Sequence, residues 1–240
     1  MTVLASKLRR ATLSGLSMDN DPAAGPPARS DEYWDTFYRR QAVPTRASPF
    51  AAFVHDAVAA DASVLVDVGC GNGRDSFFFA ASGVPTIGVD ASAGAIDLCR
   101  THVPSPSLPI TFVHSSVDSA DVLDRLRDEI ARMRRSQGPL VIYARFFLHA
   151  ISQSSESVFL GLASRLLSDM DGVLAVEFRT MRDKDRPKLT GSHFRRYVDP
   201  RRAIETAGAH GMRLDFFVEG LGYARYKGED AHVARCLFVK

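Results

Sequence analysis

VLVDVGCGNGRDS, residues 64–76, places an apolar run before an acid and three glycines at alternate positions. The run predicts a strand whose carboxyl end enters a tight turn that opens a helix. Because glycines carry no Cβ atoms, a bulky ligand can lie directly on such a turn. A second acid, Asp90, ends the next apolar run, PTIGVD, where it could accept hydrogen bonds from both hydroxyls of a ribose. The stretch therefore predicts a site for a nucleoside-type cofactor.

The spacing of the glycines distinguishes two classes of cofactor. The dinucleotide fingerprint is G-x-G-x-x-G, which brings a helix N-terminus to a pyrophosphate. Here the pattern is D-x-G-x-G-x-G, and its leading acid would repel a phosphate but suits a cationic ligand such as a sulfonium with an amino-acid ammonium. At these residues the chain resembles the class I S-adenosylmethionine-dependent methyltransferases. The alternative is a glycine turn that only connects a strand to a helix.

The resemblance implies which residues would bind S-adenosylmethionine, whose product is S-adenosyl-L-homocysteine. The glycine turn and its acid would contact the methionine moiety and the edge of the sugar, and Asp90 with Ala91 would contact the ribose. For adenine, the family has an acid after the third strand, whereas here Ser116 stands at that place, so Ser116, Val117 or Asp118 could serve. The residues of the turn are Asp67, Gly69, Cys70, Gly71, Asn72 and Gly73.

Length and composition are those of one sizeable α/β domain. The chain has 240 residues, 45% of them hydrophobic and 24% charged, and a formal net charge of +2, which gives no global case for nucleic-acid binding. Three separated cysteines form no metal or disulfide pattern, and no apolar run is long enough to span a membrane. We expect a cytoplasmic protein without a metal, as a monomer or homodimer.

Three segments are expected. Residues 1–30 are predicted to be a flexible basic extension and linker, faintly similar in composition to a transit peptide. Residues 31–60 are predicted to form a helical lid, in which Trp34 and Tyr38 could contact the substrate, although an apolar face packed on the sheet would explain them equally well. Residues 61–240 are predicted to be the S-adenosylmethionine-dependent methyltransferase domain.

Strand-like runs alternate with helical ones from residue 64 to residue 180, which predicts parallel crossover units and a doubly wound sheet. The tail breaks this alternation, because the runs 213–220 and 231–240 have no helix between them and must pair antiparallel. The expected fold is α/β, with a mostly parallel seven-stranded sheet. The resemblance places the antiparallel final strand beside the fifth.

Candidate catalytic residues follow the fourth predicted strand, 139–145. Ligands of a parallel sheet bind at the carboxyl ends of its strands, so Arg145 and His149 should lie near the transferred methyl group. His149 could act as a general base toward a hydroxyl, because an imidazole titrates near neutral pH. A histidine that packs or caps within the following turn is the competing interpretation.

The segment 179–202 carries an excess of positive charge and begins at the end of the fifth predicted strand. Arginine's fork suits a carboxylate or a phosphate, so one interpretation is an anionic substrate; a solvated basic loop is the other. The candidate substrate-binding residues in this segment are Arg179, Arg195, Arg196 and Tyr197.

The predicted function is methyl transfer to a small molecule or glycan intermediate, with O-methylation of a hydroxyl or an anionic oxygen. The segments RFFLHAI (145–151), VEFRT (176–180), HFRRYVDP (193–200) and EGLGYARYKGEDAHVAR (219–235) resemble bacterial methyltransferases of glycan and lipopolysaccharide biosynthesis. Two alternatives stay open. One is a thiol or chalcogen methyltransferase of the thiopurine or tellurite-resistance type, and the other is a non-catalytic cofactor-binding partner subunit.

Overall fold

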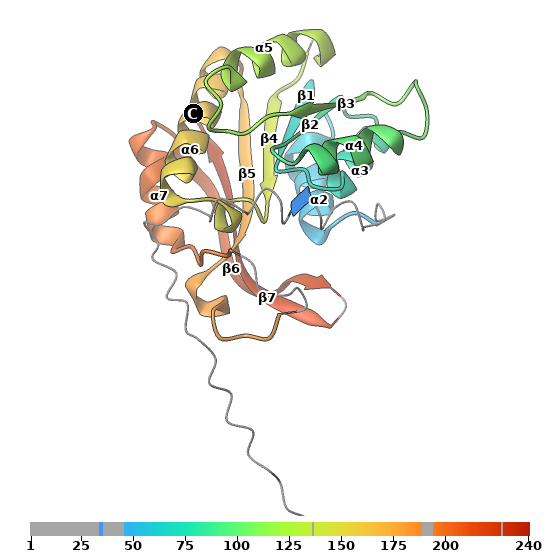
Figure 1. Cartoon of the computed structure of the whole chain (residues 1–240). Helices are drawn as coiled ribbons and strands as arrows, with labels where there is room; N and C mark the ends of the chain where they lie inside the picture. The colour runs from blue at the N-terminus through green and yellow to red at the C-terminus, as the bar shows by residue number, and fades with distance from the viewer. Residues whose placement is uncertain (1–33, 36–45, 136, 189–193, 227) are drawn as a thin grey trace, which may run out of the picture.

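The computed structural model describes residues 34–35, 46–135, 137–188, 194–226 and 228–240. A seven-stranded sheet with the order β3-β2-β1-β4-β5-β7-β6 forms its centre (Figure 1). The five strands from β3 to β5 are parallel, and β7 lies antiparallel between β5 and β6. The strands are β1 (Val64–Val68), β2 (Thr86–Asp90), β3 (Ile110–His114), β4 (Leu140–Arg145), β5 (Gly172–Arg179), β6 (Arg213–Tyr226) and β7 (Glu229–Val239). The predicted fold, including the place of its antiparallel strand, is confirmed.

Helices cover both faces of the sheet. On one face, side chains of α5, α6 and α7 pack with the strands in the largest buried cluster. On the other face, α2 and α3 pack around Tyr143, and α4 packs on Phe112. The helices are α2 (Pro49–Val54), which continues as a π-helical turn (His55–Ala59), α3 (Arg74–Ala81), α4 (Ala93–Thr101), α5 (Val122–Met133), α6 (Gln153–Asp169) and α7 (Pro200–Ala209).

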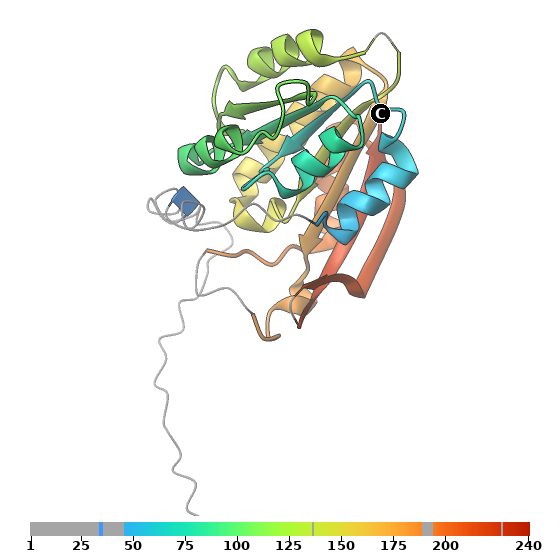
Figure 2. The same cartoon turned by 90° about the vertical axis from the view of Figure 1, so that its right-hand side faces the viewer.

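Helix α2 belongs to the core of the molecule. Its N-cap Ser48 accepts a hydrogen bond from the backbone N–H of Ala51 at 3.0 Å, and Pro49 fits the first turn. Phe50 stacks on Tyr143 of β4 with 5.1 Å between ring centroids, and the rings of Phe53 and Phe216 of β6 are 5.3 Å apart. Figure 2 shows the blue helix α2 beside the red strands of the hairpin. This part of residues 31–60 therefore packs its apolar side on the sheet, while the predicted lid stays a prediction for the rest of the segment.

The β6–β7 hairpin is longer than the sequence predicted. Residues 221–226 and 229–230, which lie between the predicted runs 213–220 and 231–240, also belong to strands. Arg179, the last residue of β5, pairs with Val233, so the part of β7 from Glu229 to His232 continues past the carboxyl end of β5. The hairpin therefore projects beyond the edge at which a doubly wound sheet binds its ligands (Figure 1).

Three charged residues form a row across the middle strands. Arg145 on β4 and Arg235 on β7 are both register partners of Glu177 on β5. Their Nε atoms donate to the two oxygens of Glu177 at 2.9 Å and 2.8 Å, and the Glu177 side chain has no exposed surface. Since two guanidinium groups share one carboxylate, the row carries a net charge of +1 at the end of the sheet.

Within the described residues, no helix combines the length and the apolar character needed to cross a membrane.

Candidate active site

The glycine turn follows β1 and leads into α3. Gly69, Gly71 and Gly73 have φ values of 73°, 54° and 73°, a region that other residues rarely enter. A Cβ atom built on Gly69 would lie 2.5 Å from the ring of Phe147, and one on Gly73 would lie 2.9 Å from Sγ of Cys99. The turn therefore requires glycine for both conformation and space, as a loop that receives a ligand on its backbone does.

Asp67 lies under this turn near the end of β1. It is buried and accepts a hydrogen bond from Oγ of Ser76 at 2.5 Å. Burial raises the pKa of Asp67 to about 8, and the nearby carboxylates of Asp75 and Asp90 add to this rise, while the Ser76 hydrogen bond opposes it. Without a cationic ligand, the carboxyl is thus mostly protonated at neutral pH. An ammonium group beside it would favour the ionised form, which fits the methionine moiety.

Asp90, the last residue of β2, holds the glycine turn from the other side. Its Oδ2 accepts the N–H of Gly71 and its Oδ1 accepts the N–H of Ser92, both at 2.8 Å. Burial raises the pKa of Asp90, and these two backbone hydrogen bonds counteract part of the rise. Each carboxylate oxygen has a second lone pair, so two ribose hydroxyls can still bind.

The other predicted cofactor residues surround this pair of acids. Sγ of Cys99 approaches the carbonyl oxygen of Gly71 at 3.3 Å, and Sγ of Cys70 approaches the same oxygen at 3.9 Å. Asn72 lies in the turn and Ala91 directly after β2. The structure thus brings the two acids, the glycines and these neighbours to one edge of the sheet.

The three residues that could contact adenine, Ser116, Val117 and Asp118, agree only in part with their predicted role. Oγ of Ser116 accepts the N–H of Asp118 at 3.2 Å, and the Asp118 carboxylate accepts a hydrogen bond from Ser155 of α6 at 2.8 Å. The side chain of Val117 packs in the core with α5 and is 6% exposed. Contact between the Val117 side chain and adenine is therefore not supported.

Arg145 lies at the carboxyl end of β4, two residues beyond Tyr143, which is the register partner of Asp67. Its Nε donates to Glu177, its side chain is 14% exposed, and among the described residues no hydrogen bond engages its terminal nitrogens. The pKa of Arg145 is raised by Glu177 and Asp75 despite burial, which on its own would lower it. This is a fixed cation at the edge where the cofactor residues meet.

His149, in the 3₁₀ turn Leu148–Ala150 after β4, is 6% exposed. Its Nδ1 accepts the backbone N–H of Arg179 at 3.2 Å. A neutral imidazole that accepts at Nδ1 carries its proton on Nε2, so it donates from Nε2 and has no second lone pair for a substrate proton. This contact argues against a base at Nδ1, so the general-base role of His149 stays a prediction, and the histidine connects β5 to the turn after β4.

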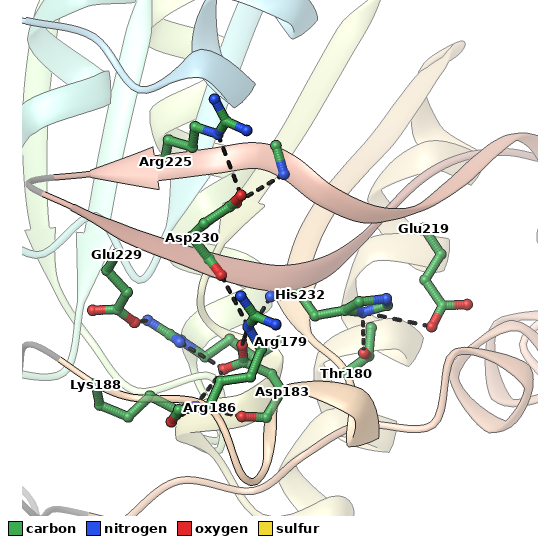
Figure 3. Close-up of polar contacts among 11 residues, drawn as sticks. Arg179, Thr180, Asp183, Arg186, Lys188, Glu219, Arg225, Glu229, Asp230 and His232 are labelled. Atoms are coloured by element: carbon green, nitrogen blue, oxygen red, sulfur yellow. Dashed lines mark hydrogen bonds and ion pairs between the residues drawn. The ribbon is translucent and has the colours of Figure 1, made fainter.

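The basic segment after β5 is largely neutralised within the protein (Figure 3). Asp183 is fully buried in the 3₁₀ turn Met181–Asp183. Its carboxylate accepts hydrogen bonds from the guanidinium of Arg179 at 2.6 Å and from the backbone N–H of His232 at 2.8 Å. It also forms an ion pair with Nζ of Lys188 at 3.0 Å. Arg179 also pairs with Glu229 of the hairpin. These donors lower the pKa of Asp183 against its burial. Substrate binding by Arg179 is therefore not supported, because two carboxylates already hold its guanidinium group.

Arg196 has a structural role too. Its Nη2 donates to the carbonyl oxygen of Leu148 at 2.9 Å and pairs with the buried Glu156, and its Nε donates to the carbonyl oxygen of Ile151 at 3.2 Å. These contacts fasten residues 194–199 to the turn after β4 and leave the Arg196 guanidinium little room for a substrate. In the same segment, Arg195 is 9% exposed. Nζ of Lys188 lies 5.6 Å from the centroid of the Tyr197 ring.

Of the two predicted aromatic contacts near the N-terminus, Tyr38 lies outside the described residues. Trp34 precedes Asp35, whose carboxylate accepts the Oγ of Ser92 and the N–H of Gly94 at the start of α4. This places Asp35, the neighbour of Trp34 in the chain, close to Asp90 at the start of α4.

Sequence reasoning missed the acids that fix the arginines. Glu177, Asp183 and Glu229 stand in ordinary strand and turn contexts, and only the strand register brings them to their cations. A pattern of opposite charges at the ends of adjacent predicted strands was the available signal.

In comparisons with known proteins, this chain matches one protein-family model and is similar to many solved structures. Residues 65–134 match the model of a methyltransferase domain. No curated protein matches in sequence. A S-adenosylmethionine-dependent methyltransferase from Anabaena variabilis is similar in structure, with a TM-score of 0.63, 17% identity, and coverage of 91% of this chain and 98% of that one.

Two further structures show the same fold. A TehB-like S-adenosylmethionine-dependent methyltransferase from Corynebacterium glutamicum has a TM-score of 0.59 and 16% identity, covering 89% of this chain and 99% of that one. Magnesium protoporphyrin IX methyltransferase from Synechocystis, solved with bound S-adenosylmethionine, has a TM-score of 0.52 and 14% identity, covering 88% and 79%.

Residues 65–134 thus match a methyltransferase domain, and the strand order and the acid–glycine edge agree with the fold of class I S-adenosylmethionine-dependent methyltransferases. The two buried acids and the glycine turn fit S-adenosylmethionine as a cofactor. The matched residues hold the glycine turn and Asp90, while β4, β5 and the β6–β7 hairpin lie outside them.

Proposed function

We propose that this methyltransferase acts on an anionic oxygen of a small molecule or glycan intermediate, a carboxylate being the simplest case. The observation that carries the proposal is Arg145, which Glu177 holds through Nε while the terminal nitrogens remain without a described hydrogen bond. Glu177 is shared with Arg235, so this carboxylate does not compensate Arg145 alone, and Asp75 is a second acid near it. A guanidinium group whose two terminal nitrogens can still donate hydrogen bonds suits a carboxylate, which can accept both.

The position of His149 supports the same acceptor. A hydroxyl needs a base to take its proton, whereas a carboxylate is already ionised at neutral pH. Since Nδ1 of His149 is occupied by the Arg179 N–H, an acceptor that needs no base fits this edge better than an alcohol.

The proposed roles of the remaining residues follow from their contacts. Bound S-adenosylmethionine supplies an activated methyl group on a cationic sulfur. Asp90 would hold the ribose hydroxyls, Asp67 would pair with the ammonium group, and the glycine turn would take the rest of the cofactor on its backbone. Arg145 would hold the acceptor oxygen in line with the methyl group, and alignment of this kind is the main requirement of the transfer.

The test is a methylation assay over carboxylic acids, the corresponding alcohols, sugar acids and small thiols, with wild-type protein and the variants Arg145→Ala and Arg145→Lys. We expect esters from acids, and a fall in kcat/KM of about 100-fold for Arg145→Ala, because a partly buried charged hydrogen bond is lost. Arg145→Lys should keep part of the activity that Arg145→Ala loses. S-adenosylmethionine affinity, measured by calorimetry, should stay unchanged.

Arg132 supplies the control, because it is an exposed arginine on α5 that pairs only with Glu129 among the described residues. Arg132→Ala should behave as wild type. Methylation of thiols alone, with Arg145→Ala as active as wild type, would support the thiol or chalcogen alternative and exclude the carboxylate proposal.

A further inference from the structure

Phe146 directly follows Arg145 and has a left-handed backbone. Its φ of 57° is the only positive value of a non-glycine residue in the described part of the chain. Its N–H donates to the carbonyl oxygen of Glu177 at 2.7 Å, so the pairing of β4 with β5 continues through it. A bulky residue in this conformation is strained, and such residues persist only where the surroundings hold them.

The ring of Phe146 meets both arginines that end the neighbouring strands. The guanidinium carbon of Arg145 lies 4.2 Å from the ring centroid, and that of Arg179 lies 5.2 Å from it. His149 adds an edge contact at 5.2 Å between ring centroids. Both cations are already held by carboxylates, Arg145 by Glu177 and Arg179 by Asp183 and Glu229. The ring thus joins two ion-paired units from β4 and β5.

Packing alone does not require this conformation. The ring also lies against Ala224, Ala231 and Val233 of the hairpin, a contact that a leucine could make. A right-handed backbone would direct the side chain elsewhere, so the left-handed one places the ring on the hairpin side, against the two arginines. The strained residue therefore serves the orientation of the guanidinium groups as well as the burial of its ring.

We infer that Phe146 is a positioning residue for methyl transfer, which fixes the Arg145 guanidinium so that its terminal nitrogens face the acceptor. The inference rests on the proposed role of Arg145. The hydrogen bond from Nε to Glu177 fixes one edge of the guanidinium group, and the ring of Phe146 fixes the orientation of its plane. The terminal nitrogens are then held toward the acceptor without a direct contact from Phe146 to the substrate.

The experiment compares Phe146→Leu, which keeps an apolar side chain but removes the aromatic face, with Phe146→Tyr, which keeps the face. Phe217→Leu is the matched control, because Phe217 is an exposed phenylalanine on β6. One readout is the Nε–H resonance of Arg145 in ¹⁵N-labelled protein with S-adenosylhomocysteine, assigned through Arg145→Lys. The second is the kinetics of the acceptor found in the assay above.

Phe146→Leu should shift the Arg145 resonance, speed rotation of its guanidinium group and raise the acceptor KM about tenfold, the scale of a lost cation–π contact in a partly buried site. S-adenosylhomocysteine affinity should not change, Phe146→Tyr should match wild type, and so should Phe217→Leu. An unaltered Arg145 resonance in a folded Phe146→Leu protein would overturn the inference. So would a KM effect that Phe146→Tyr does not rescue.

The two proposals separate cleanly. If Arg145→Ala keeps full activity while Phe146→Leu still shifts the Arg145 resonance, the proposed function fails and the positioning of Arg145 by Phe146 holds. If Arg145→Ala loses activity and Phe146→Leu has wild-type kinetics and resonances, the proposed function holds and the inference about Phe146 is wrong.

Discussion

At the scale of single residues, burial favours the protonated forms of the two acids at the cofactor edge. Asp67 is buried with one hydroxyl donor, while Asp90 has two backbone donors. The pKa of Asp67 therefore rises to about 8, and that of Asp90 rises as well. Because folding favours their protonated forms, both residues make the stability of the free protein depend on pH.

For Asp67 the sign follows from its raised pKa. Its contribution to stability is fully present below the unfolded pKa, near 3.8, and is lost as the pH rises toward about 8. We expect the free energy of unfolding, measured with urea at several pH values, to fall between pH 5 and pH 8 with a slope of at most about 1.4 kcal/mol per pH unit from this group.

Asp67→Asn should flatten that slope, because the amide does not ionise, and Asp90 should account for part of what remains. Asp97→Asn, at an exposed position on α4, should leave the wild-type slope in place. Parallel pH profiles for wild type and Asp67→Asn would show that the Asp67 carboxyl titrates normally in the folded protein.

At the scale of elements, glycine is required in the turn between β1 and α3 but not in the last turn of α7. Gly69 has a φ of 73° and no space for a Cβ atom beside Phe147. Gly208 lies in α7, and a Cβ atom there would meet nothing within 4 Å. The same substitution should therefore have opposite effects in the two elements.

Gly208→Ala should raise the free energy of unfolding by about 0.5 kcal/mol, since alanine loses less backbone entropy in a helix. Gly69→Ala should lower it by about 2 kcal/mol or more, because of both strain and overlap, and should weaken S-adenosylhomocysteine binding. Urea unfolding and calorimetry measure the two effects. A Gly69→Ala protein that is as stable as wild type and binds the cofactor normally would contradict the assigned role of the turn.

At the scale of the whole molecule, the sequence predicted what depends on local patterns. The alternation of runs predicted the sheet, and D-x-G-x-G-x-G with Asp90 predicted the edge where the acids and glycines meet, because each of these signals lies within about twenty residues. The partners of the arginines were not predictable in this way. Arg145 and Glu177 are 32 positions apart and Arg179 and Glu229 are 50 apart, and only the register of the sheet joins them.

The basic segment after β5 illustrates the same limit. Its charge excess favoured an anion site spread over several arginines, yet Asp183 and Glu229 hold Arg179, and Glu156 holds Arg196. A count of charges along the chain omits acids that arrive from other strands and helices. What remains of the predicted anion site is therefore concentrated at Arg145.

The row formed by Arg145, Glu177 and Arg235 has a consequence for the end of the catalytic cycle. Under the proposed function, transfer turns a sulfonium into a neutral thioether and a carboxylate into a neutral ester, so both substrates lose their charge in one step. The positive row keeps its charge and no longer has an anion to hold. The ester should therefore bind more weakly than the acid, so the protein's fixed charges favour product release.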